Sequence, residues 1–164
     1  MRRMTAILGA AAMVVLTAGL LAQAKANFAG KWTREAPAGG AMQGGGGRGG
    51  GRGGFGQEAT ITQDASTITI EYMQGGQNPT PQKRVYKLDG SESKNTMTFG
   101  GNSVEQTSKA AWEGDKLVIT TTTQFGETKQ ALSLVNGDLH VDSTNPGRNG
   151  GEPTTTSIVY KKAS

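Results

Sequence analysis

Apolar and polar residues alternate in several short runs along the chain. Isoleucine and tyrosine occupy every second position of residues 67–72, with threonine and glutamate between them. The same period of two runs from Leu117 into a threonine-rich stretch, through 131–134 and again through 139–142. Because successive side chains of a strand point to opposite faces, this period indicates strands with one buried face. Beyond residue 26, no window of eleven residues carries a helical stripe.

Turn signals separate these runs at regular intervals. The strongest is Asn136-Gly137, since both residues tolerate the positive φ that a two-residue hairpin requires. The other expected turns and loops are Gln63–Ser66, Asn78–Pro81, Asp89-Gly90, Glu113–Asp115, Phe125-Gly126 and 145–151. Nine or ten short strands joined this way predict an all-β antiparallel meander, either a barrel or a sandwich. An up-and-down barrel is favoured, because no long crossovers interrupt the hairpins and closure leaves no exposed edge.

The amino-terminal residues have the pattern of a secretory signal peptide. Arg2 and Arg3 precede an apolar run, and both 22–24 and 24–26 are small-x-small cleavage sites. We therefore expect a signal peptide over residues 1–26 and one domain over 27–164, in a periplasmic or secreted protein. An uncleaved membrane anchor is the alternative, and the apolar run is at the short end for one. After cleavage, no stable membrane anchor is expected.

A glycine-rich segment interrupts the domain at residues 39–56, where 12 of 18 residues are glycine. Such a segment loses much backbone entropy on ordering and has little to bury, so a flexible loop is expected. Arg48 and Arg52 lie there in RGG steps, which gives only weak support to RNA binding.

Charge and cysteine content exclude several function classes. The formal charge of +4 includes Arg2, Arg3 and Lys25, so it falls to +1 once residues 1–26 are removed. A nucleic-acid partner is therefore not expected. The absence of cysteine excludes disulfides, thiolate metal sites and cysteine nucleophiles.

Catalytic and metal chemistry find no support in the residue pattern. His140 is the single histidine and alternates with Leu139 and Val141, so it should face outward. The carboxylates are scattered, and no calcium-loop motif occurs. We expect no catalytic residues, no metal site and no cofactor, and the chain is not expected to be an enzyme.

Several short motifs resemble the calycin superfamily, which includes lipocalins and fatty-acid-binding proteins. The residues are Phe28-x-Gly30-x-Trp32 at the start, then 59–72, 107–118, 136–139 and Ile158–Lys161 at the close. The chain also resembles uncharacterised exported bacterial proteins with a Trp-x-Gly-Asp-x-Leu-Val hairpin. The glycine-rich segment replaces the helical lid of fatty-acid-binding proteins. Their last strand carries an Arg-x-Tyr pair for a ligand carboxylate, whereas here the matching positions are Ile158 and Tyr160.

Two functions remain open at this point. One is the binding of a small apolar ligand inside the barrel, since Gln106 and Ser108 share a face with Trp112 and leave room inside. The other is a structural or protein-interaction barrel with a filled core, whose protein partner the sequence does not identify. The candidate ligand contacts are Trp32, Tyr72, Tyr86, Gln106, Trp112, Ile158 and Tyr160.

Overall fold

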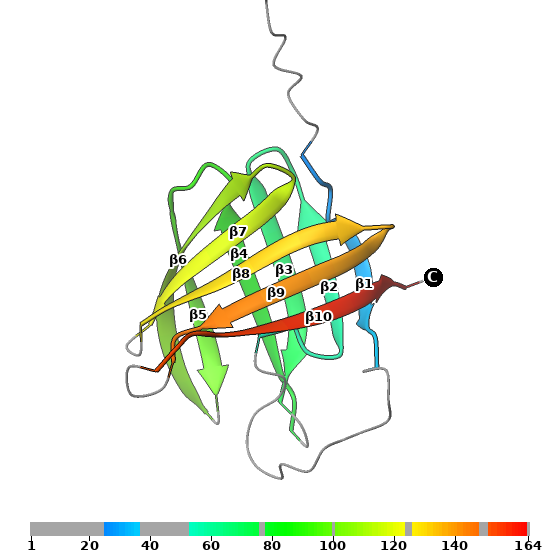
Figure 1. Cartoon of the computed structure of the whole chain (residues 1–164). Coiled ribbons are helices and arrows are strands. Elements are labelled where there is room, and N and C mark those ends of the chain that lie inside the picture. Colours follow the sequence, from blue (N-terminus) through cyan, green and yellow to red (C-terminus); the bar gives the residue numbers. More distant parts are fainter. Residues whose placement is uncertain are drawn as a thin grey trace, which may run out of the picture.

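The part of the chain that the structure describes folds into ten antiparallel strands (Figure 1). The structure, a computed structural model, describes residues 25–36, 53–75, 78–99, 101–123, 126–147 and 151–163. Within these ranges no helix is long and apolar enough to cross a membrane. Residues 1–24 of the expected signal peptide and residues 37–52, which include most of the glycine-rich segment, lie outside the described residues. The strands are β1 (Gly30–Arg34), β2 (Glu58–Gln63), β3 (Thr67–Gln74), β4 (Thr80–Lys87), β5 (Glu92–Phe99), β6 (Asn102–Glu113), β7 (Lys116–Thr123), β8 (Gly126–Val135), β9 (Asp138–Asn145) and β10 (Thr154–Lys162).

The strands form one nearly closed up-and-down barrel. Each strand except β4 pairs with the next strand in sequence, and β1 also pairs with β10, so the sheet order runs from β4 through β1 and β10 to β5. This arrangement confirms the expected calycin-like, all-β barrel. It leaves a seam between β4 and β5, which lie side by side without a backbone ladder.

Side chains join the two strands across this seam. Asn95 Oδ1 accepts a hydrogen bond from Val85 N at 2.7 Å, and Asn95 Nδ2 donates to Val85 O at 3.0 Å. Gln82 makes the same pair of bonds with the backbone of Thr98, at 3.0 Å and 3.3 Å. Ser93 Oγ accepts from Lys87 N at 2.9 Å. Amide side chains therefore replace the missing ladder, because they offer a donor and an acceptor as a peptide group does.

Most of the expected turns are where the sequence places them. Asn136 and Gly137 have φ of 54° and 89° and join β8 to β9, which confirms the hairpin. Several boundaries differ by one residue, and the largest difference is at β4, which begins at Thr80, so Thr80 and Pro81 lie in the strand rather than in a turn. Proline is tolerated there because its missing N–H would face the seam, where no ladder needs a donor.

The inward faces of the strands form a single core. Residues paired across strands share a face, as Trp32 does with Ala59 and Ala59 with Tyr72. The largest fully buried side chains are Tyr86, Tyr160, Phe28, Phe55, Ile61, Ile68, Ile70, Leu117, Ile119, Leu132, Leu139 and Val141. The alternation in the sequence therefore identified the buried face of these strands correctly.

The barrel has two ends, which we name after the phenylalanines that close them. At the Phe28 end, the chain enters β1 and Phe28 stacks on Trp112 with ring centroids 5.8 Å apart. At the Phe55 end, β1 finishes and the chain returns to β2 (Figure 1).

Candidate functional site: the barrel interior

Phe55 closes its end of the barrel from a segment that belongs to no strand. Its side chain is fully buried and packs between Tyr72 and Tyr160, with ring centroids 5.8 Å and 6.2 Å away. Phe55 N donates to the hydroxyl of Tyr160 at 2.7 Å, and that hydroxyl donates to Gly56 O at 3.2 Å. Gly53 O accepts from Gln130 Nε2 at 3.0 Å and from the Ser143 hydroxyl. We call Gly53–Gly56 the strap.

The glycines of the strap are required by its close approach to the barrel. A Cβ on Gly54 would stand 2.6 Å from the Tyr160 hydroxyl and 2.7 Å from Ile158 Cδ1. A Cβ on Gly56 would stand 2.3 Å from Met73 O, and Gly56 also has a φ of 75°. The sequence Gly-Gly-Phe-Gly therefore fits a backbone pressed against the barrel wall.

The strap differs from the flexible loop expected over residues 39–56. Its four residues are the end of that segment, and they bury a large aromatic side chain in the core. The expectation considered the glycines alone, and Phe55 supplies the apolar surface that they lack. Residues 37–52 lie outside the described ranges.

Arg84 is a half-buried charged residue in the barrel wall on β4. It lies on β4 in phase with Gln82 and Tyr86, and pairs across the ladder with Ile70, whose side chain is fully buried. Its guanidinium lies 5.4 Å from the centre of the Tyr72 ring, and Nη2 donates to Met97 Sδ at 3.0 Å. Nε is buried without a hydrogen-bond partner among the described residues.

The electrostatics around Arg84 favour its charged form. Burial acts to lower the pKa of Arg84, but interactions with Tyr86 and Tyr72 outweigh it and the pKa rises. Burial also raises the pKa of Tyr72 to about 12, although Arg84 opposes that shift. At neutral pH Tyr72 is therefore an uncharged phenol, which provides dipoles but no counter-charge for the guanidinium.

The structure divides the predicted ligand contacts into two groups. Tyr72 and Tyr160 surround Phe55, and the Tyr160 hydroxyl and Ile158 Cδ1 would both collide with a side chain at Gly54. Trp112 is half-buried and stacks on Phe28 at the opposite end.

The remaining predicted contacts lie along the wall between these groups. Trp32 is buried and donates from Nε1 to Phe28 O at 2.9 Å, and Tyr86 is buried on β4 beside Arg84. Gln106 is half-buried on β6, opposite Asn95 in the ladder.

Sequence reasoning missed Phe55 and Arg84. Arg84 shares the parity of Tyr86, so alternation alone places it on the inner face. A charged residue at an inward position indicates a candidate functional residue, because charged side chains are seldom buried without a partner. Nothing local distinguishes Phe55, since it follows a run of glycines that predicts no fixed structure.

The described residues contain no group of three or more acidic or histidine side chains that could hold a metal ion. His140 lies half-buried on β9 between the fully buried Leu139 and Val141, on the face opposite to theirs. No nucleophile–base pair was predicted. The buried side chains are aromatic, aliphatic and amide groups together with hydroxyls, of which Ser108 and Thr121 bond to each other at 2.8 Å.

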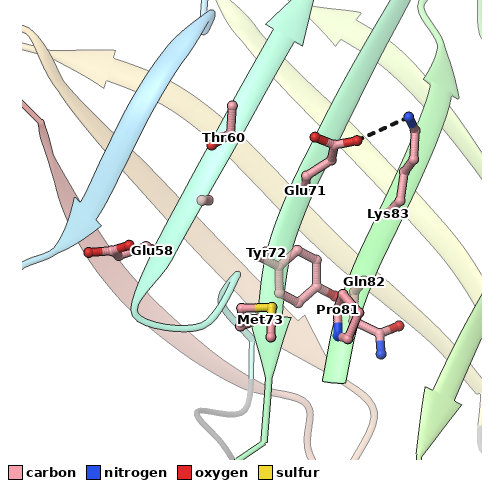
Figure 2. A pocket seen from close by; sticks show the side chains of 9 residues that line it. Glu58, Thr60, Glu71, Tyr72, Met73, Pro81, Gln82 and Lys83 are labelled. Carbon is pink, nitrogen blue, oxygen red and sulfur yellow. Dashed lines mark ion pairs between the residues drawn. The ribbon is translucent and has the colours of Figure 1, made fainter. Parts of the chain in front are cut away.

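A groove of about 390 Å³ lies across the outer face of β2, β3 and β4 (Figure 2). Glu71 and Lys83 point toward each other there and form an ion pair of 3.0 Å. Met73 and Pro81 are neighbours across the β3–β4 ladder and add apolar surface. The groove is open to solvent, and two of its oppositely charged side chains, Glu71 and Lys83, already pair with each other.

Comparisons with known proteins support the fold. No protein-family model and no curated protein matches the chain significantly. Solved structures do match, among them a crystal structure of a mutant of the fluorescent protein UnaG. It is 21% identical with a TM-score of 0.51, and the match covers 65% of this chain and 71% of that one. The likeness concerns the barrel fold alone.

Proposed function

We propose that this protein binds a small, largely apolar ligand inside its barrel, in the space that Phe55 occupies. The observation that carries the proposal is the strap: a buried aromatic side chain fills the interior from a segment outside the sheet. The amino-terminal sequence supports export to the periplasm or beyond, so we place this binding protein outside the cytoplasm.

The strap can leave without disrupting the barrel. Every hydrogen bond described for Gly53–Gly56 goes to a side chain, those of Gln130, Ser143 and Tyr160. No strand pairing depends on them, so the ladders stay intact when Phe55 moves out. A ligand of similar size would contact Tyr72 and Tyr160 in place of Phe55. These new contacts would offset the free energy lost when the strap no longer packs on the barrel.

Replacing Phe55 with alanine tests the proposal. The variant is expected to bind a neutral apolar dye such as Nile red at least several-fold more tightly than the wild type, with blue-shifted emission. It is also expected to lose about 3–5 kcal/mol of stability without ligand, as large-to-small core substitutions do. Phe28→Ala is the matched control, because Phe28 is equally buried at the other end. It should lose comparable stability without a matching gain in dye affinity.

The alternative is a filled barrel with a structural or interaction role. It is favoured by the same fact that Phe55 completes the core. In that case Phe55→Ala would lower stability and neither variant nor wild type would bind the dye. Equal dye binding by the Phe55→Ala and Phe28→Ala variants would also contradict a site at the Phe55 end. No catalytic role is proposed.

A further inference from the structure

We propose that the ligand of this barrel is a short, largely apolar peptide segment in which an aromatic residue follows glycine. The inference rests on the proposed function and specifies its ligand class. The strap then occupies the binding site as an internal copy of the ligand: Phe55 provides the aromatic ring, and the backbone of Gly53–Gly56 provides the peptide groups that the barrel binds.

The first argument is a position on β8 and β9 that binds a carbonyl oxygen. Gln130 Nε2 donates to Gly53 O at 3.0 Å, and the Ser143 hydroxyl donates to the same oxygen. Gln130 Nε2 also donates to Ser143 Oγ at 3.4 Å, so the two donors are held side by side. Ser143 is almost fully buried, and a buried donor without an acceptor is costly. A ligand that displaces the strap therefore has to bring an oxygen acceptor to this position.

The second argument is the buried hydroxyl of Tyr160, which makes two hydrogen bonds with the strap. It accepts from Phe55 N at 2.7 Å and donates to Gly56 O at 3.2 Å. A hydrocarbon chain offers neither group and would leave this hydroxyl without a partner. A peptide backbone carries an N–H and a C=O on every residue except proline, so it meets both requirements.

The third argument is the shape of the space around the aromatic ring. The Phe55 ring lies between Tyr72 and Tyr160, with ring centroids 5.8 Å and 6.2 Å away. At the preceding position, a Cβ on Gly54 would stand 2.6 Å from the Tyr160 hydroxyl. The site therefore accepts a large ring at one position and no side chain at the position before it, which favours an aromatic residue that follows glycine.

The strap competes with a separate peptide because both use the same groups of the barrel. As part of the same chain, the strap is present at a high effective concentration. The wild type should therefore bind such a peptide weakly. Removing the Phe55 side chain takes away the buried ring of the internal copy, so the affinity for a peptide that supplies the ring should rise.

The test uses the full chain with Phe55→Ala, and three capped peptides are titrated into it by calorimetry. The first is acetyl-Gly-Gly-Phe-Gly-amide, which matches the strap. The second has alanine in place of its second glycine, and the third has alanine in place of its phenylalanine. The first should bind about tenfold more tightly than either of the others, and about tenfold more tightly than it binds the wild type. Equal binding of the first two peptides would overturn the inference, because an aromatic group alone would then account for binding.

A second measurement tests the hydrogen bonds, with each substitution added to Phe55→Ala. Ser143→Ala and Tyr160→Phe should each weaken binding of the first peptide by about fivefold. Thr144→Ala is the matched control and should leave the affinity within about twofold, because the Thr144 hydroxyl bonds to that of Thr155 on the outer face. An ester in place of the amide N–H of the peptide's phenylalanine should weaken binding to Phe55→Ala, but not to the chain that also carries Tyr160→Phe. An equal loss in both chains would refute the contact with Tyr160.

The outcomes separate this inference from the function on which it rests. If Phe55→Ala binds Nile red but none of the peptides, binding in the barrel stands and the peptide inference is refuted. If it binds neither, the proposed function fails as well. Melting curves identify a variant that has failed to fold, and Phe55→Leu then takes the place of Phe55→Ala. The first peptide should raise the melting temperature of either variant, and no rise would contradict binding.

Discussion

At the scale of single residues, Asp64 holds the turn between β2 and β3 through four hydrogen bonds. It accepts hydrogen bonds from the backbone N of Ser66 and of Thr67, both at 2.7 Å, and from their hydroxyls at 2.9 Å and 2.8 Å. These bonds, the Ser66 backbone first, hold the pKa of Asp64 well below its usual range. The ionised carboxylate therefore fixes the connection between β2 and β3.

This interaction predicts a pH-dependent stability. The unfolded pKa of aspartate is about 3.9. Because the folded value is lower, the contribution is present above the unfolded pKa and is lost as pH falls through the folded one. Asp64→Asn should lower the melting temperature at pH 7, and its difference from wild type should narrow steadily below about pH 4. Circular-dichroism melts over this range provide the measurement.

Asp115→Asn is the control for this experiment, since Asp115 is an exposed aspartate in the turn between β6 and β7. Asp115→Asn should change the melting temperature little, both at pH 7 and below about pH 4. A gap between Asp64→Asn and wild type that stays constant with pH would contradict the role of the Asp64 charge.

At the scale of elements, the sequence predicted the strands well and the seam not at all. Alternation and turn chemistry are local, so Ile68–Tyr72 and Asn136-Gly137 could be assigned without knowledge of the partners. Whether β4 and β5 form a ladder depends on where the sheet closes, which no local pattern records. Gln82 and Asn95 could be interpreted only as polar inward residues until their backbone partners were known.

The seam predicts a local weakness that the side chain of Asn95 offsets. Asn95→Leu keeps the side-chain size but removes both hydrogen bonds to Val85. Leaving these backbone groups unsatisfied should cost about 1–3 kcal/mol. Hydrogen exchange should accelerate at the amides of Val85 and Lys87, and much less in the β8–β9 ladder.

Thr96→Ala, at the neighbouring outward position, is the control and should leave hydrogen exchange at the Val85 amide unchanged. Protection of Val85 that survives in Asn95→Leu would show that the seam does not depend on this side chain.

At the scale of the whole molecule, the interior combines features that the sequence could not bring together. Phe55 and Arg84 are far apart in the chain, and both contact Tyr72: Phe55 from the strap, and Arg84 from β4, which is paired with β3. The predicted contacts were chosen by parity, so residues near both ends of the barrel were grouped as one site. Depth along the barrel axis depends on the register of every strand, and alternation carries no information about it.

The contacts at the Phe28 end predict how the stability of the barrel depends on the residue at which the chain begins. Ala26 packs against the core, and its carbonyl accepts a hydrogen bond from Gln63 Nε2 at 3.0 Å. The ammonium of Lys25 lies 5.6 Å from the centre of the Trp112 ring. Cleavage after residue 24 keeps both contacts, whereas cleavage after residue 26 removes them. A chain beginning at Lys25 should therefore be more stable than one beginning at Asn27, by about 1 kcal/mol.

Urea denaturation of the two chains measures this difference in the free energy of unfolding. A third chain that starts at position 25 but carries Lys25→Ala separates the cation–π contact from the Ala26 hydrogen bond. Since an exposed cation–π contact contributes about 0.5–1 kcal/mol, this variant should fall between the other two. Equal stability of the chains beginning at Lys25 and Asn27 would contradict the prediction. The hydrogen bond from Phe28 N to Gln63 Oε1 remains in all three, so the stacked Phe28–Trp112 pair should keep this end closed in each.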